Sequence, residues 1–140
     1  MSKYKTIETE FRNAESLSKA LQEIIEQPGL ESFPLDKPQH LVGYRGDQRP
    51  ERSQFIIRQQ AVNRYSGGSS NDIGFTWNGR AYTAIVSEYD SGREGVTAML
   101  SKVKQRYAYH EVSRQAHIKG YTVREHTLPN GAIQLTLSHR

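Results

Sequence analysis

The chain has 140 residues, of which 35% are apolar and 24% charged, and it contains no cysteine. This length is typical of a single domain spanning residues 1–140, and the missing thiols exclude disulfide scaffolds, cysteine nucleophiles and thiolate metal centres. The sequence shows neither a secretory leader nor an apolar run of about eighteen residues, so we expect a protein that is not secreted and does not span a membrane.

Charge is distributed unevenly along the chain. The net charge is +4, but residues 1–36 hold four basic and seven acidic side chains, whereas residues 37–140 hold fifteen and eight. Arginines are dense between residues 45 and 64, and their planar guanidinium groups suit phosphate and carboxylate. We therefore expect any anion-binding surface in the later part. Asp47 and Glu51 interrupt the run, which is also consistent with an ordinary solvated surface of mixed charge.

The first elements are a strand, a helix and a loop. Residues 3–11 alternate between two faces, as a strand does. Asn13 can cap a helix whose apolar residues recur at helical spacing until Pro28-Gly29 ends it. The proline-containing stretch 30–39 predicts a connecting loop without regular structure.

The middle of the chain predicts two hairpins and a flexible segment. Residues 41–44 and 53–60 are expected to form strands joined by the polar, arginine-rich loop 45–52. Glycine and serine dominate residues 66–71, which predicts a mobile loop within the long polar stretch 59–71.

The next hairpin is predicted by its turn. Residues 72–77 and 80–89 flank Asn78-Gly79, a strong hairpin signal because a type I′ turn requires positive φ at both central residues.

A long helix is expected to begin near Gly92 and Gly95 and to end at Lys119-Gly120. Its apolar stripe should face the core: Val96, Met99, Leu100, Val103 and Tyr107. Beyond Tyr107 the apolar residues change face, so the second half of the helix should have a different neighbour. Two strands, 121–128 and 132–138, complete the chain around a Pro-Asn-Gly turn.

This order of elements predicts an α+β fold. We expect a largely antiparallel sheet of about six to seven strands, with two helices packed on one face.

Chemical motifs are weak. His110 and His117 lie two helical turns apart, about 10.5 Å of rise, which is too far for one ion without bending. Serine, histidine and aspartate occur without a nucleophile elbow, and Gly67-Gly68 lacks the lysine and the helix start of a phosphate loop. We expect no catalytic residue, no metal and no cofactor.

The stretch from Lys102 to His110 mixes bases with aromatic residues on a helix. Because Tyr107 falls on the core stripe, a binding site there would use Arg106, Tyr109 and His110. His110 has no visible carboxylate partner, and a structural role is favoured for it. Asp72 could move a proton, but an aspartate that opens a strand more often binds backbone donors. The candidate binding residues are Tyr44, Arg45, Arg49, Arg52, Asp72, Arg106, Tyr109 and His110.

Three of these segments carry a family resemblance. Gly43-Tyr44-Arg45-Gly46, Asp72-Ile73-Gly74-Phe75 and the stretch 105–110 together resemble the hypothetical chloroplast open reading frame 35 family, a domain of unknown function. The resemblance extends to both ends of the chain and implies a small soluble protein of cyanobacteria and algal plastids. It places the protein in the cytoplasm or the plastid stroma and names no catalytic residue.

These observations favour a non-catalytic binding or assembly-factor domain that recognises an anionic surface, most of all that of a protein partner. The alternatives are a protein that binds or sequesters a phosphorylated small molecule or nucleotide, and, less favoured, a nucleic-acid binder. A homo-oligomer could form if the acidic first helix of one copy met the basic loop of another.

Overall fold

The centre of the structure, a computed structural model that describes residues 3–139, is a five-stranded antiparallel sheet. Its strands follow the order β1-β7-β6-β5-β2, and every neighbouring pair is antiparallel. They are β1 (Tyr4–Phe11), β7 (Tyr82–Ser87), β6 (Ile73–Trp77), β5 (Phe55–Ile57) and β2 (Leu30–Ser32). The remaining strands form two separate hairpins: β3 (Gln39–Val42) with β4 (Gln48–Ser53), and β8 (Tyr121–Thr127) with β9 (Ile133–His139). The α+β class is confirmed.

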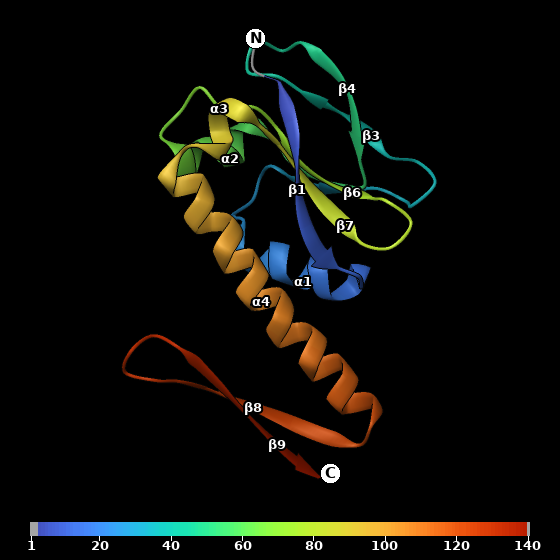
Figure 1. The fold of residues 1–140 in the computed structure, drawn as a ribbon, viewed down its shortest axis with the longest axis vertical. Coiled ribbons are helices and arrows are strands. Elements are labelled where there is room, and N and C mark those ends of the chain that lie inside the picture. Colours follow the sequence, from blue (N-terminus) through green and yellow to red (C-terminus); the bar gives the residue numbers. More distant parts are fainter. Residues whose placement is uncertain (1–2, 140) are drawn as a thin grey trace.

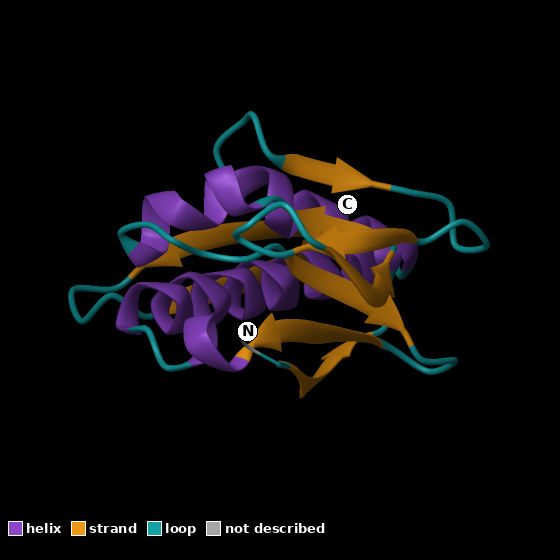
Figure 2. Ribbon diagram, turned by 90° about the horizontal axis from the view of Figure 1, so that it is seen from above, coloured by secondary structure: helices purple, strands orange, loops and turns teal. Residues whose placement is uncertain are grey.

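Helices cover one face of this sheet (Figures 1 and 2). They are α1 (Ala14–Ile24), α2 (Gln59–Ser66), the single turn α3 (Glu88–Ser91) and α4 (Glu94–Ile118). Buried side chains from α1, α2 and α4 share one hydrophobic cluster with alternate residues of β5, β6 and β7. As predicted, Asn13 caps α1, its Oδ1 accepting from the Ser16 amide at 2.9 Å.

The β3–β4 hairpin lies against the other face of the sheet. At Gly74 of β6, a Cβ atom would stand 2.0 Å from Ser53 Oγ and 2.9 Å from Leu41 Cδ2. The absence of a side chain at Gly74 therefore lets both strands of the hairpin approach the sheet. Ser53 and Thr76 also share a hydroxyl hydrogen bond of 2.6 Å.

The strand pairing in the middle of the chain corrects the prediction. β3 pairs with β4, and all of β4 except Ser53 lies inside the expected loop 45–52 and not in the strand expected at 53–60. All three residues of β5 are buried, which suits an internal strand, and β5 pairs with β2 and β6. Strand β2 itself lies in the stretch 30–39, where no regular structure was expected.

Helix α2 replaces the polar segment that was expected after residue 59. Its first amide, that of Gln59, donates to Asp72 Oδ1 at 2.7 Å, so the cap comes from a residue thirteen positions later. Short-range sequence signals do not reveal such a cap. The expected mobility of residues 66–71 stays a prediction, although Ser70 and Asn71 are buried.

The β6–β7 hairpin is confirmed, but its turn is not of type I′. Trp77 and Tyr82 form the last pair, and the loop between them has a hydrogen bond of 3.0 Å from the Asn78 amide to the Ala81 carbonyl. Gly79 alone in this loop has positive φ, at 98°. The Asn78 side chain accepts from the amides of Arg80 and Ala81, so it closes a longer turn.

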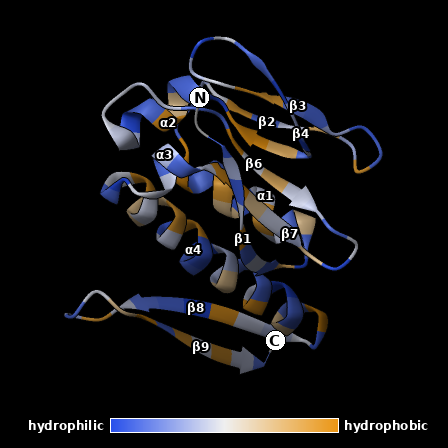
Figure 3. Ribbon diagram, turned by 45° about the horizontal axis from the view of Figure 1, so that its top comes forward, coloured by the Kyte–Doolittle hydropathy of each residue, from blue (hydrophilic) through white to orange (hydrophobic). Residues whose placement is uncertain are grey.

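Helix α4 packs against two different neighbours, as the change of face of its apolar residues predicted. Val96, Met99, Val103 and Tyr107 are buried in the core. The second half extends beyond the sheet and contacts β8 (Figure 1). Hydrophobic and hydrophilic residues alternate along the β8–β9 hairpin (Figure 3). Gly120, with φ of 91°, makes the turn into it.

Gly95 should tolerate no side chain, although it lies in a helix. Replacing glycine by alanine in a helix normally stabilises by about 0.5–1 kcal/mol, but here a Cβ would stand 1.8 Å from the Tyr65 carbonyl oxygen. We expect Gly95→Ala to lower the free energy of unfolding by about 2 kcal/mol in urea titration. Gly92→Ala is the control, because its Cβ meets nothing within 4 Å. Equal stability of the two variants would contradict the close α2–α4 contact.

Candidate functional site

The sequence-predicted binding residues fall into two groups that the structure does not bring together. Tyr44, Arg45, Arg49 and Arg52 lie on the β3–β4 hairpin, with Asp72 behind it. The segment from Arg106 to His110 lies on α4, where it meets α1 and β8 (Figure 1). The hairpin and the helices cover opposite faces of the sheet, so the two groups cannot form one surface.

Tyr44 and Arg45 form an exposed pair at the turn of the hairpin. The Tyr44 ring is 45% exposed. The Arg45 Nε donates to the Tyr44 hydroxyl at 2.9 Å, and the guanidinium lies 5.4 Å from the ring centroid. The Tyr44 amide donates to Asn71 Oδ1 at 3.0 Å. This hydrogen bond fixes the backbone, while both side chains remain available to a partner.

Arg49 has a structural role. Its side chain is only 13% exposed and pairs with Asp47 at 3.3 Å. Its guanidinium also lies 5.3 Å from the centroid of the Tyr4 ring, a cation–π contact between the hairpin and the edge strand β1. Arg49 therefore attaches the hairpin to the sheet.

Arg52 is exposed and is oriented by His40. His40 Nδ1 lies 2.7 Å from the Arg49 carbonyl oxygen, which can only accept, so Nδ1 carries the proton. Nε2 then accepts from Arg52 Nε at 3.3 Å. With a hydrogen on Nδ1 and a lone pair on Nε2, the His40 ring satisfies both contacts and fixes the direction of the Arg52 side chain.

Asp72 joins three elements from a buried position. Its side chain is 1% exposed. Oδ2 accepts from the Val42 amide of β3 and from Arg58 Nη1, both at 2.8 Å, while Oδ1 accepts from the Gln59 amide at the start of α2. Burial raises the pKa of Asp72 above its usual value, although Arg58 and the backbone donors favour the ionised form. Asp72 acts here as a structural anchor.

A polar groove of about 420 Å³ lies beside this anchor. Its lining includes His40, Gln48, Arg58, Gln59 and Asp72. The Arg58 guanidinium, which donates to Asp72 and also pairs with Glu31, is 24% exposed. The groove therefore offers amide and guanidinium donors but no free carboxylate for proton transfer, because Asp72 is fully bonded.

Sequence reasoning missed a second buried carboxylate that supports the hairpin. Asp90 is 0% exposed and its Oδ2 accepts from the Asn71 amide and from the Ser87 hydroxyl, each at 2.9 Å. Asn71 in turn holds Tyr44. The available signal was Ser87 three residues before Asp90, which has the spacing of a helix cap and does cap α3.

The candidate residues on α4 make ion pairs and contacts within the molecule. Arg106 pairs with Glu23 of α1 at 2.8 Å and with Glu125 of β8 at 2.7 Å, and its guanidinium lies 4.4 Å from the Tyr109 ring centroid. His110 contacts Glu23 as well, so the expectation that it lacks a carboxylate partner is wrong. Burial opposes ionisation of Glu23, but hydrogen bonds from His110 and Arg106 hold its pKa below the usual value.

Asp72→Asn should destabilise the fold while leaving its shape nearly unchanged. The amide would present a donor to the Val42 amide and Arg58, and it would remove one charge of a buried ion pair. Arg58 would keep Glu31, so we expect a loss of about 2 kcal/mol in urea unfolding, below the usual cost of breaking a buried pair. Asp36→Asn, at an exposed loop position, is the control and should stay within about 0.5 kcal/mol of wild type. Equal stability of both variants would refute the anchor role.

Glu111 should make stability depend on acid pH. Hydrogen bonds from Arg114, Gln115 and Ser16 lower its pKa from 4.5 to about 2. A lowered pKa in the folded state contributes stability above pH 4.5, and this contribution is lost as the pH falls to about 2. Glu111→Gln should therefore be less stable than wild type at pH 7, and the difference should shrink below pH 4.5. Thermal unfolding at a series of pH values tests this, and a difference that is constant from pH 7 to 3 would contradict it.

Two further features were sought within residues 3–139: a group of metal-binding side chains and a helix able to span a membrane. Within that range no cluster of three or more histidine, aspartate or glutamate side chains is arranged to hold a metal ion. No helix there is both long enough and apolar enough to cross a membrane.

The fold is of the α+β class, and comparison with known proteins gives the family of the chain. Residues 29–136 match the family described as Protein of unknown function (DUF1257), and the chain belongs to this family. A stretch of 68 residues is 38% identical to the uncharacterized protein ycf35 of Guillardia theta. This match covers 47% of the chain and 53% of that protein, so the chain spans about half of its relative. No solved structure matches significantly. The family resemblance inferred from the sequence is confirmed.

Proposed function

We propose that the protein is a non-catalytic binding domain that recognises an acidic surface of a protein partner through its β3–β4 hairpin. The observation that carries this proposal is the exposed set of Tyr44, Arg45 and Arg52 on a backbone held from below by Asp72 and Asn71. Fixing the backbone in advance reduces the entropy lost on binding. Tyrosine and arginine are also the residues enriched at binding hot spots.

The spacing of the cations favours an extended partner. Arg52 stands opposite His40 at the open end of the hairpin, and Arg45 lies in its turn. At about 3.3 Å per residue, the two are roughly 15 Å apart along the strands. Arg49, between them, is occupied by Asp47 and Tyr4. A single phosphate group could not bind both exposed arginines, whereas a row of acidic side chains could.

The two buried carboxylates beneath the hairpin support binding over catalysis. Asp72 and Asp90 are buried and hydrogen-bonded to backbone amides. A general base must present an open oxygen to a substrate proton. Both carboxylates hold the hairpin from almost completely buried positions, at 1% and 0% exposed, which is the arrangement expected of a recognition surface.

Charge removal on the hairpin should abolish partner capture without unfolding the protein. We expect the double variant Arg45→Gln/Arg52→Gln to retain less than a tenth of the partner recovered by wild type from a lysate of the source organism. Its stability should change by about 0.5 kcal/mol or less, because both side chains are exposed. Arg80→Gln/Arg124→Gln removes the same charge at exposed positions elsewhere and should capture normally.

Defined probes separate the alternatives. Poly-glutamate should bind wild type and not the hairpin variant, whereas inorganic phosphate, nucleotides and a duplex oligonucleotide should bind neither. Equal capture by the two double variants would refute the proposal. Selective binding of the oligonucleotide, with a steep loss between low and moderate salt, would replace it with nucleic-acid recognition. Light scattering that shows association of wild type alone would identify the partner as a second copy.

A further inference from the structure

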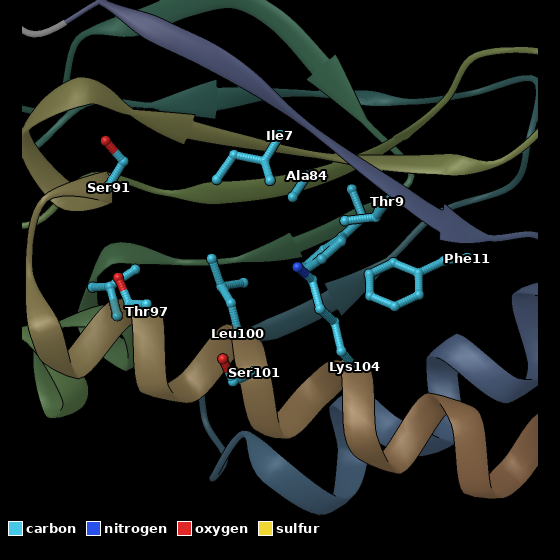
Figure 4. A pocket seen from close by; sticks show the side chains of 11 residues that line it. Ile7, Thr9, Phe11, Ala84, Ser91, Thr97, Leu100, Ser101 and Lys104 are labelled. Atoms are coloured by element: carbon cyan, nitrogen blue, oxygen red, sulfur yellow. The ribbon is translucent and has the colours of Figure 1, made fainter.

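An apolar pocket of about 250 Å³ lies between the edge strand β1 and helix α4, on the face of the sheet away from the β3–β4 hairpin (Figure 4). Aliphatic and aromatic side chains contribute much of its wall: Ile7, Phe11, Phe75, Ala84, Val96 and Leu100. Hydroxyl groups of Thr9, Ser91, Thr97 and Ser101 interrupt this lining, and Lys104 lies at one end. The pocket is thus apolar inside with a single charged side chain.

A change of register in β1 opens this pocket. Ile7 pairs with Ala84, but the next pair is Phe11 with Tyr82. Between these two pairs β1 therefore advances by four residues while β7 advances by two. Thr9 Oγ1 donates to the Tyr82 carbonyl at 2.5 Å, where the regular pairing is interrupted. The irregular strand therefore leaves a space above α4 that core side chains do not fill.

Lys104 is the feature that points to a ligand. Its side chain extends from α4 towards Thr9 across the pocket (Figure 4). It has no hydrogen bond or ion pair to any residue between 3 and 139, whereas Arg106 and Arg114 on the same helix are both paired.

The carboxylates around Lys104 lie outside the pocket. Glu111 is bonded to Arg114 and Ser16. Glu8 and Glu10 line a neighbouring groove of about 430 Å³ that also includes Lys104. The lining of the pocket itself holds no acidic residue. An anion that places its tail in the pocket therefore meets a cation and no buried negative charge.

We propose that this pocket binds a small amphipathic carboxylate, with its hydrocarbon part among Phe11, Ala84 and Leu100 and its carboxylate on Lys104. A dry cavity of about 150 Å³ holds benzene, so 250 Å³ accommodates a longer chain of medium length. Burying that chain supplies affinity in proportion to its apolar area, and the charge contact selects a carboxylate over an alcohol of equal length. This site uses none of the hairpin residues.

Octanoate and 1-octanol are the probes, because they have the same number of carbons and differ in charge. With ¹⁵N-labelled protein, octanoate should shift the amide signals of residues 7–11 and 97–104 in a saturable manner. Lys104→Gln should weaken octanoate binding at least fivefold and leave octanol binding unchanged. Lys102→Gln, at an exposed position on the same helix and outside the pocket lining, should leave both unchanged.

A second variant tests the cavity independently of charge. Thr97→Phe introduces a ring from the exposed rim of the pocket, and it should abolish binding of both probes while circular dichroism remains that of wild type. The proposal is overturned if octanoate causes no saturable shifts at millimolar concentration. It is equally overturned if Lys104→Gln binds octanoate as wild type does, or if folded Thr97→Phe still binds either probe.

Discussion

The position of the β3–β4 hairpin depends on the buried carboxylate of Asp72. An ionised group in the interior is costly unless it is paired and hydrogen-bonded. Asp72 meets this requirement through Arg58 and through amides from β3 and α2, which are distant from each other in the sequence. The same contacts position three elements at once: the hairpin over β6, the first turn of α2, and the start of β6 itself. The contacts that make the buried charge tolerable therefore also hold these elements in one arrangement.

Helix α4 packs on two separate parts of the molecule, the core and the β8–β9 hairpin, because its sequence carries two apolar stripes in succession. Up to Tyr107 the stripe enters the core, and the Tyr107 hydroxyl accepts from the Arg12 and Asn13 amides at 2.9 and 3.0 Å, just before α1. On another face of the helix, the adjacent Arg106 forms ion pairs that connect α1 to β8. The acidic excess of the first 36 residues is therefore partly neutralised within the molecule, at Glu23, which contacts Arg106 and His110. This leaves less of it for pairing with the basic hairpin of another copy.

The sequence predicted correctly those elements that depend on interactions between residues close together in the chain. The Asn13 cap, the core stripe of α4, the Asn78-Gly79 hairpin and the final two strands all depend on residues within a few positions of each other. The errors occurred where partners are remote. β4 contains Pro50 and alternating polar residues, which suit an edge strand and equally suit a loop. α2 takes its cap from Asp72, and β5 is recognisable as an internal strand only once β2 and β6 are beside it. Burial also divided the candidate site residues. Arg49 and Asp72 are largely buried and stabilise the hairpin on the sheet. Tyr44, Arg45 and Arg52 are exposed.

The number of arginines in a segment therefore indicates a functional surface only after those paired with carboxylates of the same molecule have been subtracted. Arg49, Arg58, Arg106 and Arg114 are equal contributors to the formal charge, but each is paired with a carboxylate within 3.3 Å. Arg45 and Arg52 contact instead a tyrosine hydroxyl and a histidine ring nitrogen, neither of which carries a negative charge. The β3–β4 hairpin therefore presents two arginines whose charge is not cancelled by a carboxylate. On the opposite face, Lys104 forms no ion pair with a described residue and lies beside an apolar pocket whose lining holds no carboxylate. In both places the unneutralised charge is exposed beside groups whose positions the core already fixes, which is the physical condition for binding an anion.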